Sequence, residues 1–246
     1  MERHMTVNAG NSDSFFSRAQ EILNFYNLPS IAEFKEHLPS KIRWKKDINR
    51  SIADKCSNLL QKEMEEKSTL KHCDIQILKI HEVHPVWRTL PPITYEVKKA
   101  NIEARFLTGT YLLQEHIQRF NGNSDEQKCL LCQIEQEDLI HFLLRCPALN
   151  EKRQKVFPAL KQAIICNIGQ NKWQEHFTGN KELLMQVIID SSKVRENILI
   201  LNEETSTEIE RISRKRCYYL HCGRTLLHKR MAVARQFEAK DPGCKD

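Results

Sequence analysis

The sequence predicts a mostly α-helical protein with a small Cys3His knuckle inserted near the middle of the chain. Apolar residues recur with helical spacing along most of its 246 residues. Only 7 glycines are present, which is too few for the many tight turns of an all-β fold. Three cysteines and one histidine gather in residues 129–146, where they favour a compact knuckle over a continuous helix.

The composition places the chain among globular proteins, because 40% of its residues are hydrophobic and 28% are charged. No apolar run is long enough for a transmembrane helix, so no membrane association is expected. The polar N-terminus lacks the apolar segment of a secretory signal, which predicts an intracellular location. In a reducing compartment, the 9 cysteines are expected to be thiols or metal ligands rather than disulfides.

The N-terminal region, residues 14–93, is expected to hold three helices and an irregular linker, and the polar residues 1–13 are expected to be disordered. Ser14 caps the first apolar run, and Ser30–Glu33 has the pattern of a capping box for a short second helix. A long amphipathic helix follows over residues 41–67. Prolines then prevent long helices up to residue 93, with short extended pieces expected near Asp74 to Leu78.

The middle region, residues 94–168, is expected to contain helices on both sides of the knuckle. The helical period returns at Thr94 and is interrupted at Gly109, and a second helix is predicted over Tyr111–Phe120. A further helix is predicted from Asn150, with a fresh start at Pro158 because proline suits the first position of a helix.

The C-terminal region, residues 169–246, is expected to be helical and to carry a basic helix. A short helix is predicted over Asn180–Asp190. Thr205–Glu208 has the pattern of a second capping box, which predicts a long helix from there to about Phe237.

The strongest chemical signal is the spacing Cys129-x2-Cys132-x8-His141-x4-Cys146. Two thiolates separated by two residues can face one ion, and four soft ligands suit one tetrahedral Zn²⁺ in a closed, structural site. Positions five apart on an α-helix diverge by about 140°, so His141 and Cys146 can meet only if the helix ends between them. Pro147 is consistent with that ending. The alternative is four residues that bind no metal.

Three acidic residues flank these candidate ligands and have two interpretations. Glu135, Glu137 and Asp138 could accept the second ring N–H of His141, which would fix its tautomer. The interpretation that we favour from sequence is that they are charges at a helix N-terminus, stabilised by the helix dipole.

A basic segment near the C-terminus suggests an anionic partner. The chain carries a net charge of +6, whereas Arg211–Gln236 alone contains eight Lys/Arg and no acid. Cations neutralise phosphates and tyrosines stack on unpaired bases, so we predict RNA or DNA binding here. The candidate contacts are Arg211, Arg214, Lys215, Arg216, Tyr219, Arg224, Lys229 and Arg230. The alternative is an ordinary solvated helix face with Tyr219, Leu220 and Leu227 in a core.

A second metal set in the same helix is left open. Cys217, His221, Cys222 and His228 have ligand chemistry, but their spacing matches no zinc pattern. Packed helical thiols are the alternative.

The residues before and within the cluster resemble a known family. The run Lys99–Gln114 and the run Glu137–Pro147 are similar to the C-terminal zinc-binding region of non-LTR retrotransposon reverse transcriptases. His84–Trp87 and Cys217–His221 also resemble that region. The resemblance implies that residues 94–168 form a reverse-transcriptase-type zinc-binding domain whose metal ligands are Cys129, Cys132, His141 and Cys146.

The resemblance also implies a function. In such elements this region follows the polymerase and helps to hold template RNA and target DNA, which implies a nuclear location. The chain contains no Asp-Asp dipeptide, so the paired aspartates of the polymerase are missing and no catalysis is expected. Its length suggests a separated C-terminal piece of such an enzyme.

Three hypotheses follow from the sequence. The leading one is a zinc-binding, nucleic-acid-associated module with no small-molecule substrate. The second is a zinc-stabilised protein-interaction scaffold that docks partners on Trp44, Ile48 and Ile52. The third is a retroelement remnant without a cellular role. The sequence does not specify the oligomeric state.

Overall fold

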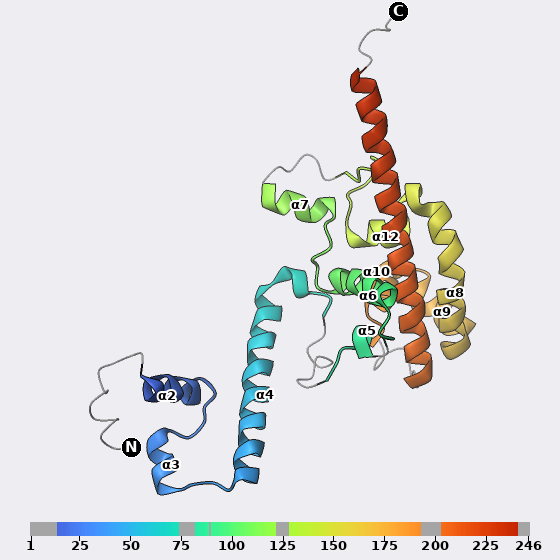
Figure 1. Cartoon of the computed structure of the whole chain (residues 1–246). Helices are drawn as coiled ribbons and strands as arrows, with labels where there is room; N and C mark the ends of the chain where they lie inside the picture. The colour runs from blue at the N-terminus through green and yellow to red at the C-terminus, as the bar shows by residue number, and fades with distance from the viewer. Residues whose placement is uncertain (1–13, 74–81, 89, 122–127, 193–202, 241–246) are drawn as a thin grey trace, which may run out of the picture. The chain divides into compact units, whose positions relative to one another are not determined.

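The protein is an assembly of helices in two compact units, as seen in a computed structural model (Figure 1). Unit 1 comprises Met1–Glu66 and Lys79–Glu82, and unit 2 comprises Lys67–Leu78 and Val83–Asp246. The structure describes residues 14–73, 82–88, 90–121, 128–192 and 203–240. The predicted disorder of residues 1–13 and the extended pieces near residues 74–78 lie outside these ranges.

The predicted fold class is confirmed. In the described residues no regular strand occurs, and the one β-type pairing is an isolated bridge between Lys128 and Gln136. The Cys3His group lies close together within a short irregular segment between helices. In the same residues, we find no helix with the length and apolar character that crossing a membrane requires.

Unit 1 contains α2 (Phe15–Phe25), α3 (Ile31–Glu36) and α4 (Lys41–Glu66). The first two begin as the sequence predicts. The Ser14 side chain accepts a hydrogen bond from the Ser17 backbone N–H at 3.1 Å. Ser30 and Glu33 form the reciprocal capping box, which satisfies two backbone donors at the start of α3. None of the residues in these three helices is buried, so Trp44 is not the core anchor that its size suggests.

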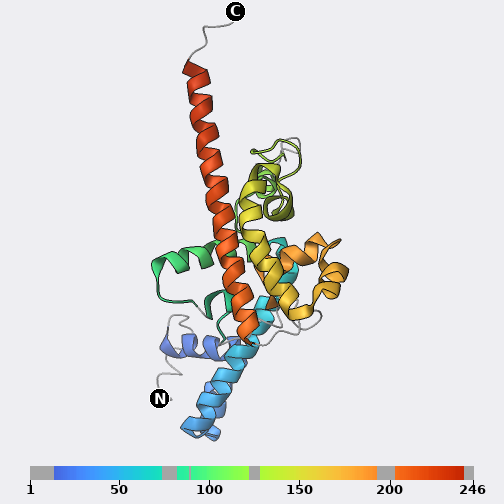
Figure 2. The ribbon, with the colours of Figure 1, turned by 90° about the vertical axis from the view of Figure 1, so that its right-hand side faces the viewer.

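Unit 2 contains the remaining described elements. They are η1 (Ser68–Leu70), α5 (Pro85–Arg88), α6 (Thr94–Leu107), α7 (Gln114–Asn121), η2 (His141–Arg145), η3 (Pro147–Leu149), α8 (Asn150–Ile168), α9 (Gln170–Phe177), α10 (Lys181–Ile189) and α12 (Glu203–Lys240). The helix α12 packs against α6, α8 and α10, and runs beside α8 in Figures 1 and 2.

One continuous core joins the helices of unit 2 on both sides of the predicted division between residues 94–168 and 169–246. Phe106 and Leu160 from the first range are buried in the same apolar cluster as Ile188 and Leu220 from the second. The physical reason is that the knuckle and α8 expose apolar faces that α10 and α12 cover. The boundary at residue 93 stays a prediction, and the main segment of unit 1 ends at Glu66.

Several helix boundaries differ from the prediction. The helix α8 runs without a break through Pro158, so the fresh start predicted there is wrong. The helix α12 begins at Glu203, two residues before the predicted capping box at Thr205–Glu208. The helix α9 was not predicted, and its Trp173 is buried in the core. Trp87 is 36% exposed and is therefore not buried in the core.

Candidate metal centre

The four predicted ligands meet at one point. One ligand atom from each of Cys129, Cys132, His141 and Cys146 lies within 4.8 Å of all the others. The Sγ atoms of Cys129 and Cys146 are 3.8 Å apart, and Cys132 Sγ is 3.4 Å from His141 Nε2. With ordinary Zn–S and Zn–N bond lengths, the edges of a tetrahedron are about 3.8 Å for S–S and about 3.6 Å for S–N. The donor set and its spacing therefore fit one tetrahedral ion.

The first pair of ligands is positioned by a tight turn. The Cys129 N–H donates to the Glu135 carbonyl at 2.8 Å, and the Gln133 N–H donates to the Cys129 carbonyl at 2.8 Å. Gln133 reverses the chain with a φ of 57°, in the left-handed region. The bridge between Lys128 and Gln136 closes the turn, so both thiols face the same side.

The second pair is positioned by a π-helical turn. In η2 the Cys146 N–H donates to the His141 carbonyl at 2.7 Å, which is an i to i+5 hydrogen bond. That bond brings two residues five apart onto the same side, where an α-helix would separate them by about 140°. The turn ends at Cys146, whose ψ of 117° is extended because Pro147 follows.

Acidic residues next to the ligands hold His141 in place. Its Nδ1 atom is 3.2 Å from Glu135 Oε2, which leaves Nε2 facing the thiols. Its backbone N–H donates to Asp138 Oδ1 at 2.5 Å, at the start of the turn. Both interpretations from sequence are thus realised, by different residues: Glu135 is placed to fix the histidine tautomer, and Asp138 is a charge at a helical N-terminus.

Glu137 links the knuckle to the C-terminal helix. Its carboxylate accepts from Arg224 Nε at 2.8 Å and Arg224 Nη2 at 2.9 Å, and from the Gln114 N–H at 3.1 Å. The Glu137 side chain is 1% exposed, and its Oε1 lies 3.9 Å from Cys129 Sγ. This buried pair was not predicted, because its two members are far apart in the sequence.

Two buried guanidinium groups hold the end of the π-helical turn. Arg153 Nε and Arg216 Nη2 both donate to the Leu143 carbonyl, at 3.1 Å and 3.0 Å. Arg153 also donates to the Cys146 carbonyl at 3.0 Å. These cations satisfy carbonyls at the negative end of a helical turn. Burial lowers the pKa of Arg216 to about 10.

The thiols of Cys129 and Cys146 have opposite pKa shifts because they are hydrogen-bonded to each other. The hydrogen bond from Cys146 lowers the pKa of Cys129 to about 5, and the same contact raises the pKa of Cys146 above its ordinary value. Zinc binds thiolates, so binding of an ion at this point would release the proton of Cys146.

The predicted nucleic-acid contacts do not form one exposed stripe, and this is a correction to the sequence analysis. Arg214 and Arg216 are 2% and 0% exposed. Arg214 Nε is 3.7 Å from Glu103 Oε2, and Arg216 lies over the Phe157 ring at 5.0 Å. Arg224 is paired with Glu137 as described above. Each of these three cations contacts an acid or a carbonyl from another element of unit 2.

The other five predicted contacts lie closer to the surface. Arg211 is exposed and donates to Glu208 at 2.6 Å and 2.7 Å. Lys215, Lys229 and Arg230 are exposed. Tyr219 is half-buried, and the Lys152 ammonium lies 5.5 Å from its ring centroid.

The second candidate set of metal ligands, on which the sequence left two interpretations, does not come together in the structure. Cys217 is buried against the Ile188 carbonyl, while His221 Nδ1 lies 2.9 Å from the Tyr111 hydroxyl. Cys222 is exposed. Among the described residues, the Cys3His cluster is the only group of cysteine, histidine or acidic side chains that lie close enough together to hold a metal ion.

In comparisons with known proteins, no family model, no curated protein and no solved structure matches this chain. The resemblance to reverse transcriptases therefore depends on the sequence runs quoted above.

Proposed function

We propose that this protein is a zinc-stabilised helical module, derived from the C-terminal region of a retrotransposon reverse transcriptase, that associates with nucleic acid and has no catalysis of its own. The observation that carries the proposal is the convergence of three sulfurs and one imidazole nitrogen within 4.8 Å. All four tetrahedral positions are taken by protein ligands, so the ion has no open position for a reacting water.

The structural role follows from where the ligands lie. Cys129 and Cys132 come from a tight turn, and His141 and Cys146 come from a π-helical turn that carries buried Phe142 and Leu143. One Zn²⁺ would join the two turns. Apparent zinc affinities of small structural sites correspond to roughly 10–16 kcal/mol, comparable with the stability of a whole domain.

Zinc binding is tested by native mass spectrometry of the full chain with and without a chelator. We expect one zinc per chain for the wild type. Cys132→Ser should lose it, whereas Cys222→Ser, an exposed thiol outside the cluster, should keep it. Hydrogen exchange should show lost protection over residues 128–146 in Cys132→Ser alone. Retention of zinc by Cys132→Ser would contradict the assignment.

Nucleic-acid association is supported by the exposed cations of α12. Lys229 and Arg230 are exposed on α12, whose C-terminal part extends past the other helices of unit 2 (Figure 2). No acid accompanies them between Arg211 and Gln236. Cations on an acid-free helix surface attract phosphates through counterion release, which makes the affinity depend steeply on salt.

This part of the proposal is tested by titrating single-stranded RNA and duplex DNA at several salt concentrations. Replacing Lys229 and Arg230 by glutamine should reduce the slope of log affinity against log salt by about 1.8 on duplex DNA. The matched control replaces Lys98 and Lys172, which are exposed cations elsewhere in unit 2, and should leave the slope nearly unchanged. Equal effects of the two double variants would show that only net charge matters.

A further inference from the structure

Unit 1 contains an apolar groove that has no part in the candidate metal centre. The groove has a volume of about 790 Å³ and is walled by α2, α3 and the start of α4. Its apolar lining includes Phe15, Ile22, Leu23, Phe34, Leu38 and Trp44. Several of these side chains are far more exposed than core residues, with 78% for Phe15 and 84% for Leu38. Exposed apolar surface of this kind is typical of an interaction site.

The groove is held in shape by contacts among its own helices. The Gln20 side chain accepts from the Ile31 N–H at 3.1 Å and so joins α2 to α3. The Phe34 and Trp44 rings meet edge to face at 4.7 Å and join α3 to α4. At the other end of α2, the Ser51 hydroxyl of α4 donates to the Tyr26 carbonyl. A binding groove fixed before binding costs its ligand less ordering entropy.

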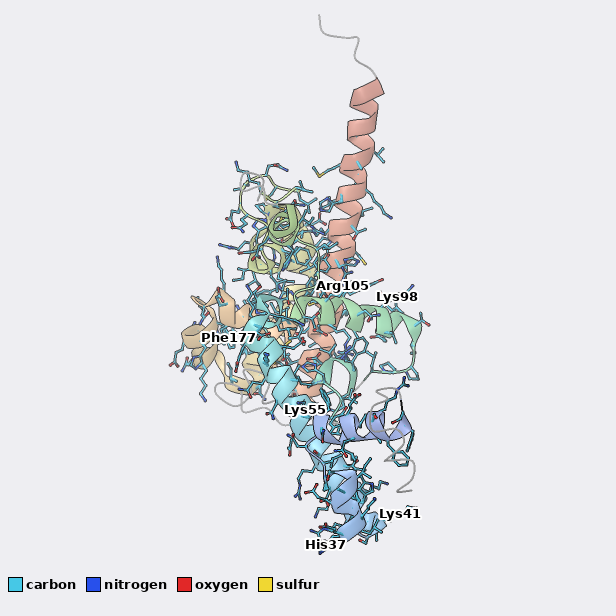
Figure 3. All side chains as sticks on the ribbon, turned by 90° about the vertical axis from the view of Figure 1, so that its left-hand side faces the viewer. His37, Lys41, Lys55, Lys98, Arg105 and Phe177 are labelled. Carbon is cyan, nitrogen blue, oxygen red and sulfur yellow. The ribbon has the colours of Figure 1, made fainter. Side chains whose placement is uncertain are left out.

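The charge around the groove is positive. The charged residues that line it, among those described, are Arg18 and Lys41. Figure 3 shows Lys41 at the N-terminal end of α4, where residues 41–50 carry five Lys/Arg and a single acid. The nearby Glu33 carboxylate is engaged in the capping box, accepting from the Ser30 N–H at 2.6 Å. The groove therefore presents an apolar floor beside a cationic edge.

We propose that this groove binds an amphipathic helical segment of a partner protein, with its apolar face in the groove and acidic residues against the start of α4. The walls are helices, and unit 1 offers no strand in its described part, so a partner cannot add to a sheet edge. An amphipathic helix supplies apolar side chains at i, i+3, i+4 and i+7, which suits a groove of this size. Acidic flanking residues match the cationic edge and select against basic helices.

The experiment uses the full zinc-loaded chain and a labelled synthetic helical peptide of about 18 residues, with Leu and Phe on one face and Glu on the other. A second peptide has the same apolar face and Lys in place of Glu. We expect the acidic peptide to bind at least about tenfold more tightly than the basic one, as measured by fluorescence anisotropy. Lys41→Glu should reduce this preference.

Two matched variants separate the groove from general electrostatics. Leu38→Asp places a charge in the groove and should weaken binding of the acidic peptide by about tenfold or more. Ile42→Asp adds the same charge at a side chain that is 86% exposed and does not line the groove, and it should change binding by less than about twofold. Circular dichroism should show both variants folded, since both positions are exposed.

Three results would overturn the proposal. The first is the absence of binding by the acidic peptide. The second is equal weakening by Leu38→Asp and Ile42→Asp, which would mean that the peptide senses only charge. The third is a concentration-dependent dimer that Leu38→Asp abolishes, which would assign the groove to a second copy of this chain.

Discussion

Replacing Arg224 by methionine should destabilise unit 2 rather than only weaken nucleic-acid binding. Methionine keeps apolar contact near the Tyr111 and Phe142 rings, over which the guanidinium lies at 5.7 Å and 6.0 Å, but it removes both hydrogen bonds to Glu137. Removing one partner of a buried pair typically costs about 3–5 kcal/mol, because the other charge stays buried and unpaired. Glu137 keeps the Gln114 N–H, so we expect the lower end, about 3 kcal/mol.

The assay is urea unfolding at saturating zinc, with Lys229→Met as the control. Lys229 is exposed on the same helix, and its replacement should change the unfolding free energy by less than about 0.5 kcal/mol. The double variant Arg224→Met with Glu137→Met should cost less than the sum of the two single changes, by about 2 kcal/mol, since neither charge is then left alone. Two results would refute the reasoning: a benign Arg224→Met, or strict additivity in the double variant.

Further changes test the site and the interior. Glu135→Gln should weaken zinc binding by about 10–100-fold, measured by competition with a chromophoric chelator, because the carboxylate that orients His141 is lost. Burial raises the pKa of the Glu103 carboxyl well above its ordinary value of 4.5. The folded state therefore holds a proton that the unfolded state releases, and stability is lost as pH rises from 4.5 toward the folded pKa. Glu103→Gln should then increase the unfolding free energy at pH 7.5 and have little effect at pH 4, as measured by urea unfolding. Gly109→Ala should lower the unfolding free energy by about 2–4 kcal/mol, because φ is +60° and the added Cβ would lie 2.5 Å from the Thr69 carbonyl oxygen. A Gly109→Ala protein as stable as the wild type in thermal unfolding would contradict that estimate.

Local chemistry made part of this structure predictable. Ser14 and Ser30 begin helices as expected, because an N-cap hydrogen bond involves residues only three apart. The ligand set was predictable for a similar reason. Four soft side chains at this spacing have few arrangements other than one metal site, and the ending of the helix before Pro147 was anticipated.

The residues that sequence patterns misplaced are those with distant partners. Arg214 and Arg216 belong to a run of cations that is typical of a solvated face. Their burial depends on Glu103 in α6 and on the Leu143 carbonyl in η2, which are distant in the sequence. Helical periodicity specifies which residues share a face, but the partner of that face is set by tertiary packing.

The same limit explains the missed role of Glu137. As one of three acids beside a histidine, it has the pattern of a helix-terminal charge. Only the approach of α12 converts it into the buried partner of Arg224. A pair separated by this much sequence leaves no local pattern, so it becomes visible only in the folded structure.

The contacts of Arg214, Arg216 and Arg224 inside unit 2 also change what the proposed nucleic-acid binding should look like. The sequence alone offers seven Lys/Arg among the predicted contacts, which would give a salt slope of about −6 on duplex DNA if all met phosphates. The structure leaves four of them exposed, Arg211, Lys215, Lys229 and Arg230, which limits the slope to about −4. The ion pair between Arg211 and Glu208 must break before Arg211 can meet a phosphate, so we expect a slope shallower than −4. A slope steeper than −4 would therefore mean that cations outside this set bind the phosphates, and the interface would have to include another basic surface such as residues 41–50.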